Sequence, residues 1–234
     1  MSEEEEAARV VPVIAALRAA LGPRALLSVD TFYPSVAEAA VGAGADMVND
    51  VSGGRCGGGA PEPTAASPMF RLVARLGVPY VLMHSRGDAG AASGGSAVYA
   101  AGAGEGGGGA REGAAVVAEV RRWLGAGVGA AEAAGVPRWD LLVDPGLGFA
   151  KTGAHSCALL RAGRDALPPG LPALVGASRK GFIGDACGGA APRERDWGTA
   201  AAVAASVRGG ADFVRVHNVA AMRDAARVAD AVFR

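Results

Sequence analysis

The sequence predicts an α/β fold built on a parallel β-sheet that is either open or closed into a barrel. Short apolar runs recur along the 234 residues, and helix-like stretches separate them. These runs are rich in Val and Leu with little polar alternation, which is typical of strands buried on both faces. Two junctions, 43–50 (AGADMVND) and 209–216 (GGADFVRV), each join a helix end, a glycine turn and a strand, as expected for a β/α repeat.

The elements follow in order along the chain. A first helix begins in the acidic run Glu3 to Glu6, which suits the positive end of a helix dipole. Strands are predicted at 26–30, 46–50, 80–84, 141–144, 173–178 and 213–217. Helices are predicted at 34–41, 68–76, 111–134, 197–208 and 220–233. The segments 53–67 and 87–109 are rich in Gly, Ala, Ser and Pro, and we expect flexible surface insertions without function there.

Composition excludes several classes of function. Lys and Arg number 23, and Asp and Glu also number 23, so no broad field attracts nucleic acid or an anionic membrane. No apolar run reaches the roughly 18–20 residues that a membrane helix needs. The acidic start MSEEEEAARVV argues against a signal or transit peptide, so we expect a soluble intracellular protein with no visible targeting segment. Three cysteines without C-x-x-C spacing indicate reduced thiols. The three histidines are too far apart in sequence to predict a zinc site.

The stretch DPGLGFAKTG, residues 144–153, admits two interpretations. One is a loop that wraps nucleotide phosphates, and the other is a strand end that offers the carboxylate of Asp144 to a polar ring. A phosphate loop needs glycine directly before the lysine, so that backbone N–H groups turn onto the anion. Ala150 stands there before Lys151, and Gly148 lies three positions before the lysine. The spacing therefore disfavours the nucleotide interpretation.

Polar residues end all six predicted strands. They are Asp30-Thr31, Asn49-Asp50, His84, Asp144, Ser178-Arg179-Lys180, and Arg215 with His217. One such residue alone is often a helix cap, but the carboxyl ends of parallel strands converge on one ligand-binding face. Carboxylates and an amide suit a heterocycle rich in N–H groups, whereas cationic residues suit an anion. Arg215 and His217 are two apart on a strand and therefore share a face.

With these motifs in place, the sequence resembles dihydropteroate synthase. The matching stretches are SVDTFYPSVAEAAVGAGADMVNDVSGG, VPYVLMHSRGD, LLVDPGLGFAKTG, PALVGASRKGFIGD and ADFVRVHNV. The resemblance implies a single pterin-binding domain over 1–234 with a TIM (β/α)8-type barrel, incomplete because only strands 3 to 8 are present. The family's Asn-x-Thr-Pro-Asp-Ser-Phe and Glu-Ser-Thr-Arg loops have no counterpart here. We therefore expect an N-terminally truncated synthase with low or no activity as an isolated chain.

The resemblance also implies the reaction and its residues. Hydroxymethyldihydropterin diphosphate would condense with p-aminobenzoate, giving dihydropteroate and diphosphate. Asp30, Asn49, Asp144 and Lys180 would hold the pterin; Phe149, Ser178 and Lys180 would border p-aminobenzoate; Arg215 and His217 would bind diphosphate. Asp144, Lys180, Arg215 and His217 are the expected catalytic residues, and no residue is assigned as a metal ligand. Met83 either packs near the pterin or is an ordinary core methionine. Mg²⁺ is expected from the family, although its usual ligand loop is absent.

The resemblance further implies partners and leaves alternatives. A homodimer through the later helices is expected, as is fusion to, or derivation from, a protein with a pterin diphosphokinase domain, because GVPRWDLLVDPGLGFAK is closest to eukaryotic synthases. The compartment would be the mitochondrial matrix for a plant-type protein and otherwise the cytoplasm. One alternative is a pterin-binding module of the methyltetrahydrofolate methyltransferase type, without synthase chemistry. Another is a phosphate-binding barrel for an unrelated substrate.

Overall fold

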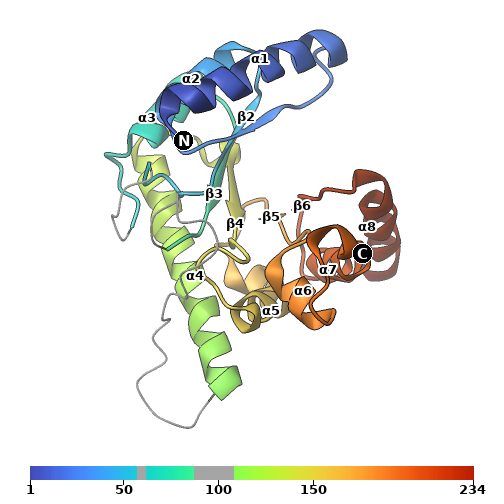
Figure 1. Cartoon of the computed structure of the whole chain (residues 1–234). Helices are drawn as coiled ribbons and strands as arrows, with labels where there is room; N and C mark the ends of the chain where they lie inside the picture. Colours follow the sequence, from blue (N-terminus) through green and yellow to red (C-terminus); the bar gives the residue numbers. More distant parts are fainter. Residues whose placement is uncertain (57–61, 87–107) are drawn as a thin grey trace. The chain divides into compact units, whose positions relative to one another are not determined.

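The structure is a computed structural model that describes residues 1–56, 62–86 and 108–234 (Figure 1). The chain divides into two compact units. Unit 1 comprises Met1–Gly90 and Gly125–Leu142, and unit 2 comprises Ala91–Leu124 and Val143–Arg234.

Unit 1 alternates helices and parallel strands. The order is α1 (Glu3–Leu21), β1 (Ser28–Asp30), α2 (Pro34–Gly42), β2 (Met47–Asp50), α3 (Pro68–Leu76) and β3 (Tyr80–Met83). A four-stranded sheet has the order β1-β2-β3-β4, in which β4 (Leu141–Asp144) begins in unit 1 and ends in unit 2. All four residues of β3 and of β4 are buried, in agreement with strands covered on both faces.

Local signals in the sequence set the helix ends of unit 1. Ser2 caps α1 through a capping box with Glu5: the Ser2 hydroxyl accepts from the Glu5 N–H, and a Glu5 carboxylate oxygen accepts from the Ser2 N–H. A proline lies in the first turn of α2 and of α3, where its missing N–H costs no helical bond. Gly77 ends α3 in the left-handed conformation.

Unit 2 begins in α4 (Gly108–Ala133), whose last residues belong to unit 1. The short helix η1 (Arg138–Asp140) precedes β4, and Val143 of β4 bridges to Ala173. The remaining elements are α5 (Gly153–Ala162), η2 (Gly163–Ala166), β5 (Leu174–Val175), α6 (Gly181–Ala186), η3 (Pro192–Glu194), α7 (Asp196–Arg208), β6 (Phe213–Val214) and α8 (Val219–Phe233). Strands β5 and β6 pair in parallel, and α7 packs beside α8 (Figure 1).

The two similar junctions noted in the sequence share one atomic arrangement. In unit 1, Arg18 of α1 donates to the Gly44 carbonyl and pairs with Asp46, whose carboxylate accepts from the Leu27 N–H at 2.7 Å. In unit 2, Arg164 donates to the Gly210 carbonyl and pairs with Asp212, whose carboxylate accepts from the Ala173 N–H at 2.7 Å. The repeat is therefore confirmed, and in each copy it fixes the entry of one strand beside another.

Most element predictions are confirmed, with differences at the ends. Six strands lie within the part of the chain that the structure describes, but β5 and β6 are shorter than 173–178 and 213–217 because their last residues turn away as loops. Helices α5 and α6 were not among the predicted helices. Within the predicted insertion 53–67, the described residues form turns before α3, and residues 57–61 lie outside the description. The insertion 87–109 lies outside it apart from 108–109, which begin α4.

In the described residues, no helix combines the length and the apolar character that a membrane crossing requires.

Candidate active site

Asp144 is a buried carboxyl group of unit 2, at the carboxyl end of β4. It is 6% exposed, and its Oδ1 accepts a hydrogen bond from the Gly146 N–H at 2.7 Å. Burial raises the pKa of Asp144, while the positive charge of Lys180 and the Gly146 N–H oppose that rise. A desolvated carboxylate of this kind gains strongly from N–H donors supplied by a ligand.

The loop after Asp144 is held by its own polar groups. Buried Lys151 donates from Nζ to the carbonyls of Gly146 at 2.9 Å and of Phe149 at 3.1 Å. Thr152 caps α5 by accepting from the His155 N–H at 3.2 Å. These contacts agree with the sequence-based rejection of a phosphate loop, since Lys151 fixes the loop backbone and Thr152 begins a helix.

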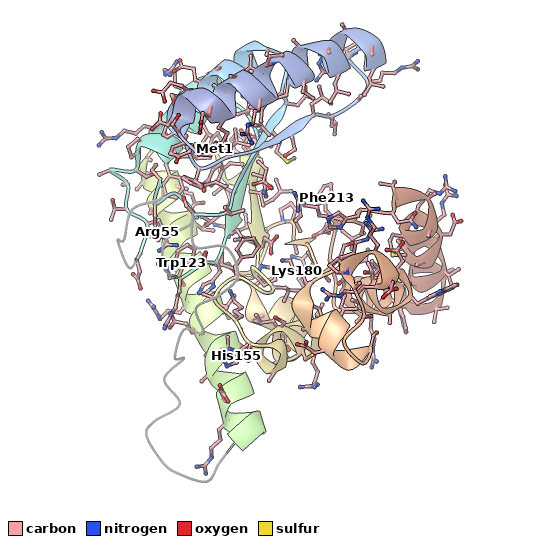
Figure 2. All side chains as sticks on the ribbon, viewed as in Figure 1. Met1, Arg55, Trp123, His155, Lys180 and Phe213 are labelled. Carbon is pink, nitrogen blue, oxygen red and sulfur yellow. The ribbon has the colours of Figure 1, made fainter. Side chains whose placement is uncertain are left out.

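His155 attaches this loop to α4 within unit 2. Its Nδ1 accepts from the Thr152 N–H at 3.2 Å, so Nε2 carries the proton and donates to Glu112 at 2.6 Å. His155 is buried, and Figure 2 shows it at α5, close to α4. This pair was not anticipated from the sequence, because its partners are 43 positions apart.

Lys180 joins the two loops of unit 2 that follow β4 and β5. This lysine, labelled in Figure 2, precedes α6, and its Nζ donates to the Leu147 carbonyl. The same Nζ lies 4.7 Å from the centroid of the Phe149 ring. A Cβ added at Gly148 would lie 3.2 Å from the Lys180 Cδ, so glycine leaves the space that the lysine stem occupies. An aromatic face and a cation are thus placed together beside Asp144.

The end of β6 meets the end of β5 at an open cavity of about 320 Å³. Ser178 Oγ lies 2.9 Å from His217 Nδ1 and also accepts from the His217 N–H at 3.3 Å. The cavity is lined by Gly176, Ser178, Lys180, Arg215, Val216 and His217. Arg215 and His217 are both exposed, and both line this cavity, as their two-residue spacing predicts. Three basic side chains and a hydroxyl suit a phosphate or diphosphate.

Unit 1 carries the other candidate residues at the carboxyl ends of its strands. Asp30 and Asn49 are register partners in β1 and β2; Asp30 is exposed and Asn49 is buried. Met83 ends β3 and is buried. The structure thus places Asp30, Asn49 and Met83 at the carboxyl ends of three parallel strands of the unit 1 sheet. The remaining six candidates lie within unit 2.

Asp50, also buried in unit 1, was not chosen as a site residue and organises the loop after β2. Its two oxygens accept from the N–H groups of Ser52 and Gly54, at 2.7 and 2.9 Å, and from the Tyr80 hydroxyl at 2.6 Å. Burial raises the pKa of Asp50, and these hydrogen bonds oppose the rise. The position of Asp50 at the end of a buried strand indicates an important residue. Position alone does not distinguish a residue that organises the loop from one that contacts a ligand.

These features of unit 2 are those of an α/β enzyme. Its strand ends and the loops after them carry a buried carboxyl group, an aromatic ring and a cavity suited to an anion. The chain belongs to the family of pterin-binding enzymes, because the model of the family described as "Pterin binding enzyme" matches residues 1–217. Its relatives within that family include dihydropteroate synthases. The one from Mycobacterium leprae is 43% identical over 231 residues, which cover 97% of this chain and 72% of the relative.

Longer fungal and plant proteins match as well. The folic acid synthesis protein fol1 of Pneumocystis carinii is 40% identical over 99% of this chain, and the mitochondrial folate synthesis bifunctional protein of Arabidopsis thaliana is 36% identical over all of it. The chain spans only 28% and 40% of the lengths of these two relatives.

Solved structures confirm the barrel-type α/β fold expected from the sequence. Dihydropteroate synthase of Xanthomonas albilineans with 4-aminobenzoic acid matches with a TM-score of 0.81 and 39% identity, over 99% of this chain and 73% of that one. The same enzyme with 7,8-dihydropteroate matches with a TM-score of 0.79 over 99% and 77%. The resemblance stated from the motifs is therefore confirmed, and a methyltetrahydrofolate-binding module is not favoured.

Proposed function

We propose that this chain acts in folate biosynthesis by condensing 6-hydroxymethyl-7,8-dihydropterin diphosphate with p-aminobenzoate, with release of diphosphate. The observation that carries the proposal is the unit 2 cluster in which Asp144, Lys180 and Phe149 lie beside the cavity of Arg215 and His217. The similar Xanthomonas albilineans enzyme has been solved with 4-aminobenzoic acid and with 7,8-dihydropteroate, a substrate and the product of this reaction.

The pterin would be held by groups that complement its ring edge. Asp144 accepts from ring N–H and amino groups, and the loss of its hydration makes those hydrogen bonds strong. Lys180 Nζ, now on the Leu147 carbonyl, approaches the pterin carbonyl. From the family resemblance, Asp30 and Asn49 are also expected to hold the pterin and Met83 to pack near it; within unit 1 these three residues lie at the carboxyl ends of β1, β2 and β3.

The reaction would begin with the departure of diphosphate. The C–O bond to diphosphate breaks, and its electron pair leaves on the diphosphate oxygen beside Arg215 and His217, which stabilise the growing negative charge. The pterin methylene becomes cationic and is stabilised by the nearby carboxylate of Asp144. The p-aminobenzoate nitrogen, held beside Phe149 and Ser178, then forms the C–N bond and releases one proton to water.

Mg²⁺ is also part of the proposal, as a companion of the diphosphate substrate. The described ranges 1–56, 62–86 and 108–234 contain no group of three or more His, Cys, Asp or Glu placed to hold a metal ion. The anion-binding cavity is cationic, so its side chains do not fit Mg²⁺. The ion commonly keeps waters and binds substrate phosphates, and it would enter on the diphosphate oxygens.

A homodimer through α7 and α8 is proposed as the working assembly. These helices border an apolar cavity of about 770 Å³, and Trp197, Val228 and Val232, which line it, are 89%, 65% and 67% exposed. Exposed apolar patches of this kind are typical of interfaces. Sedimentation equilibrium tests the proposal: Val232→Glu should give monomers, and the Val13→Glu control on α1 should not. Dimers of Val232→Glu would contradict this interface.

The supply of substrate and the compartment complete the proposal. We expect a pterin diphosphokinase domain, such as a bifunctional folate protein would carry, to provide the diphosphate ester. For a plant-type protein the proposed compartment is the mitochondrial matrix, and otherwise the cytoplasm; the A. thaliana relative is named mitochondrial. Imaging of a fluorescent fusion with the natural N-terminus decides between these compartments.

The function is tested by ligand binding and by turnover with matched variants. Wild-type chain should bind pteroate in calorimetry and form dihydropteroate from both substrates. Asp144→Asn should weaken pteroate binding by about tenfold or more, because it removes a charged acceptor. Asp140→Asn, at the opposite end of β4, is the control and should bind normally. Equal binding by wild type and Asp144→Asn would contradict the proposal.

A further inference from the structure

Arg179 adopts a backbone conformation that its side chain disfavours. It lies between Ser178 and Lys180 with φ of +60°, in the left-handed region that residues with a Cβ enter rarely. Such a residue persists only where its surroundings hold it in place, and such positions cluster at functional sites. The two neighbours of Arg179 are both candidate substrate contacts, so its conformation sets the directions in which they point.

The start of α7 contacts Arg179 at three points, all within unit 2. Its guanidinium donates from Nε and Nη2 to the two oxygens of Asp196, at 3.0 and 3.2 Å. Its carbonyl accepts from Nη1 of Arg195 at 2.8 Å, and its N–H donates to the Thr199 hydroxyl at 3.2 Å. We call residues Arg195, Asp196 and Thr199 the α7 clamp. The side chain, the carbonyl and the backbone N–H of Arg179 are thus all held by residues at the N-terminus of α7.

Asp196 also reaches the strand end that carries His217. Asn218 Nδ2 donates to Asp196 Oδ2 at 2.9 Å, and Ser178 Oγ lies 2.9 Å from His217 Nδ1. One carboxylate therefore ties the loop after β5 to the loop after β6. The Arg179 hydrogen bond, and then that of Asn218, holds the pKa of Asp196 below its ordinary value, so Asp196 is ionised at neutral pH.

We propose that Asp196 is a positioning residue: through the α7 clamp it keeps Arg179 left-handed, and it thereby aims Ser178 and Lys180 and aligns them with His217. The inference rests on the proposed function for the identity of the ligand. It assigns no substrate contact to Arg179 or Asp196. The reaction geometry depends instead on a carboxylate that lies behind the residues that touch substrate.

The sharpest test compares two substitutions of Arg179 with one of Asp196, using pteroate as the calorimetric probe. Asp196→Asn removes the charge that holds the guanidinium and should weaken binding by about tenfold, in keeping with the sensitivity of active sites to small displacements. Arg179→Ala should weaken binding similarly, because alanine also disfavours a positive φ. Arg179→Gly should bind nearly as wild type, because glycine adopts this φ without a clamp.

Combining the substitutions separates positioning from direct contact. In the Arg179→Gly background, Asp196→Asn should have little further effect, since the backbone no longer needs the clamp. Equal losses in Arg179→Gly and Arg179→Ala would mean that the guanidinium itself binds the ligand, and would overturn the proposal. Wild-type affinity in Asp196→Asn would overturn it as well. Asp165→Asn, at an exposed position of η2 in unit 2, is the control for charge removal, and unfolding curves verify that each variant folds.

A structural measurement keeps this proposal separate from the proposed function. If the wild-type chain fails to bind pteroate, the function fails, but crystal structures of wild type and Asp196→Asn still report the φ of Arg179. Release of Arg179 from the left-handed region in Asp196→Asn supports the clamp. A left-handed Arg179 in both structures overturns it.

Discussion

The Lys180 ammonium group lies 4.7 Å from the centroid of the Phe149 ring, so two residues 31 positions apart in sequence form one surface in unit 2. The contact brings the loop after β4 against the start of α6, and the lysine also bonds the Leu147 carbonyl. The proposed p-aminobenzoate side of the site is therefore a pair of loops that depend on each other.

Replacing Phe149 by leucine should weaken p-aminobenzoate binding while leaving the fold intact. The change removes the aromatic wall proposed to contact the p-aminobenzoate ring, and an aromatic pair contributes roughly 0.5–1.5 kcal/mol, which corresponds to about a 2- to 13-fold loss of affinity. Calorimetry with p-aminobenzoate and pteroate measures the loss. Phe233→Leu is the matched control, because the Phe233 ring on α8 also contacts a cation, with its centroid 5.9 Å from Cζ of Arg208 on α7. A similar loss in both variants would argue against a role of Phe149 in binding.

Gly148→Ala should destabilise the protein and disturb Lys180. Gly148 has φ of +76°, and an added Cβ would lie 3.2 Å from the Lys180 Cδ. Gly170 has a similar φ of +72° but an added Cβ there meets nothing within 4 Å, so Gly170→Ala measures the backbone cost alone. We expect that cost to be about 1–2 kcal/mol, and roughly 1 kcal/mol more at Gly148. Urea unfolding measures the stability cost of each substitution, and pteroate titration measures the effect on Lys180. Equal costs at the two glycines would show that the Lys180 side chain moves aside without a penalty.

Ala150→Gly should raise the free energy of unfolding, which is unusual for a change to glycine. Ala150 has φ of +49°, a conformation that glycine adopts without strain. The relief of about 1 kcal/mol is partly offset by the greater entropy of the unfolded chain, so a net gain of up to about 1 kcal/mol is expected. Ala126→Gly, on an exposed position inside α4, should instead cost about 1 kcal/mol. Destabilisation in both variants would contradict the expected relief of strain.

Two aspartates should have opposite effects on stability as pH changes. Burial raises the folded-state pKa of Asp144 above its unfolded value. Its contribution to the free energy of unfolding is therefore greatest in acid and is lost as pH rises through the folded-state pKa. The hydrogen bond from the Leu27 N–H lowers the pKa of Asp46, so its contribution is present above the unfolded value and is lost as pH falls through the folded pKa.

Difference curves isolate these two titrations. The stability of wild type minus that of Asp144→Asn, measured by urea unfolding from pH 3 to pH 8, should fall as pH rises above about 3.9, the ordinary aspartate value. Wild type minus Asp46→Asn should rise with pH below the same value. Curves of the same slope would contradict the assignment of burial as the dominant influence on Asp144.

Much of the fold could be predicted because its signals are local. Pro34 and Pro68 mark helix starts, Gly77 marks a helix end, and buried Val and Leu runs mark strands, so most elements were located within a few residues. Strands β5 and β6 were overestimated because the apolar pattern continues into residues that leave the ladder to line the cavity. Helix α6 follows the SRK stretch and has only six residues, too few for a periodic pattern to emerge.

The sequence by itself determined the family, the order of strands and helices, and the polar residues at the strand ends, because these depend on short motifs and on residue type at fixed spacing. Only the tertiary structure decided which contacts support the site: Lys180 lies over the Phe149 ring, His155 hydrogen-bonds Glu112, and Asp196 accepts from Arg179. Each of these pairs joins segments at least 17 positions apart. Asp196 at the start of a helix resembles an ordinary first-turn acid, and its contact with a left-handed arginine exists only once β5 and α7 have packed.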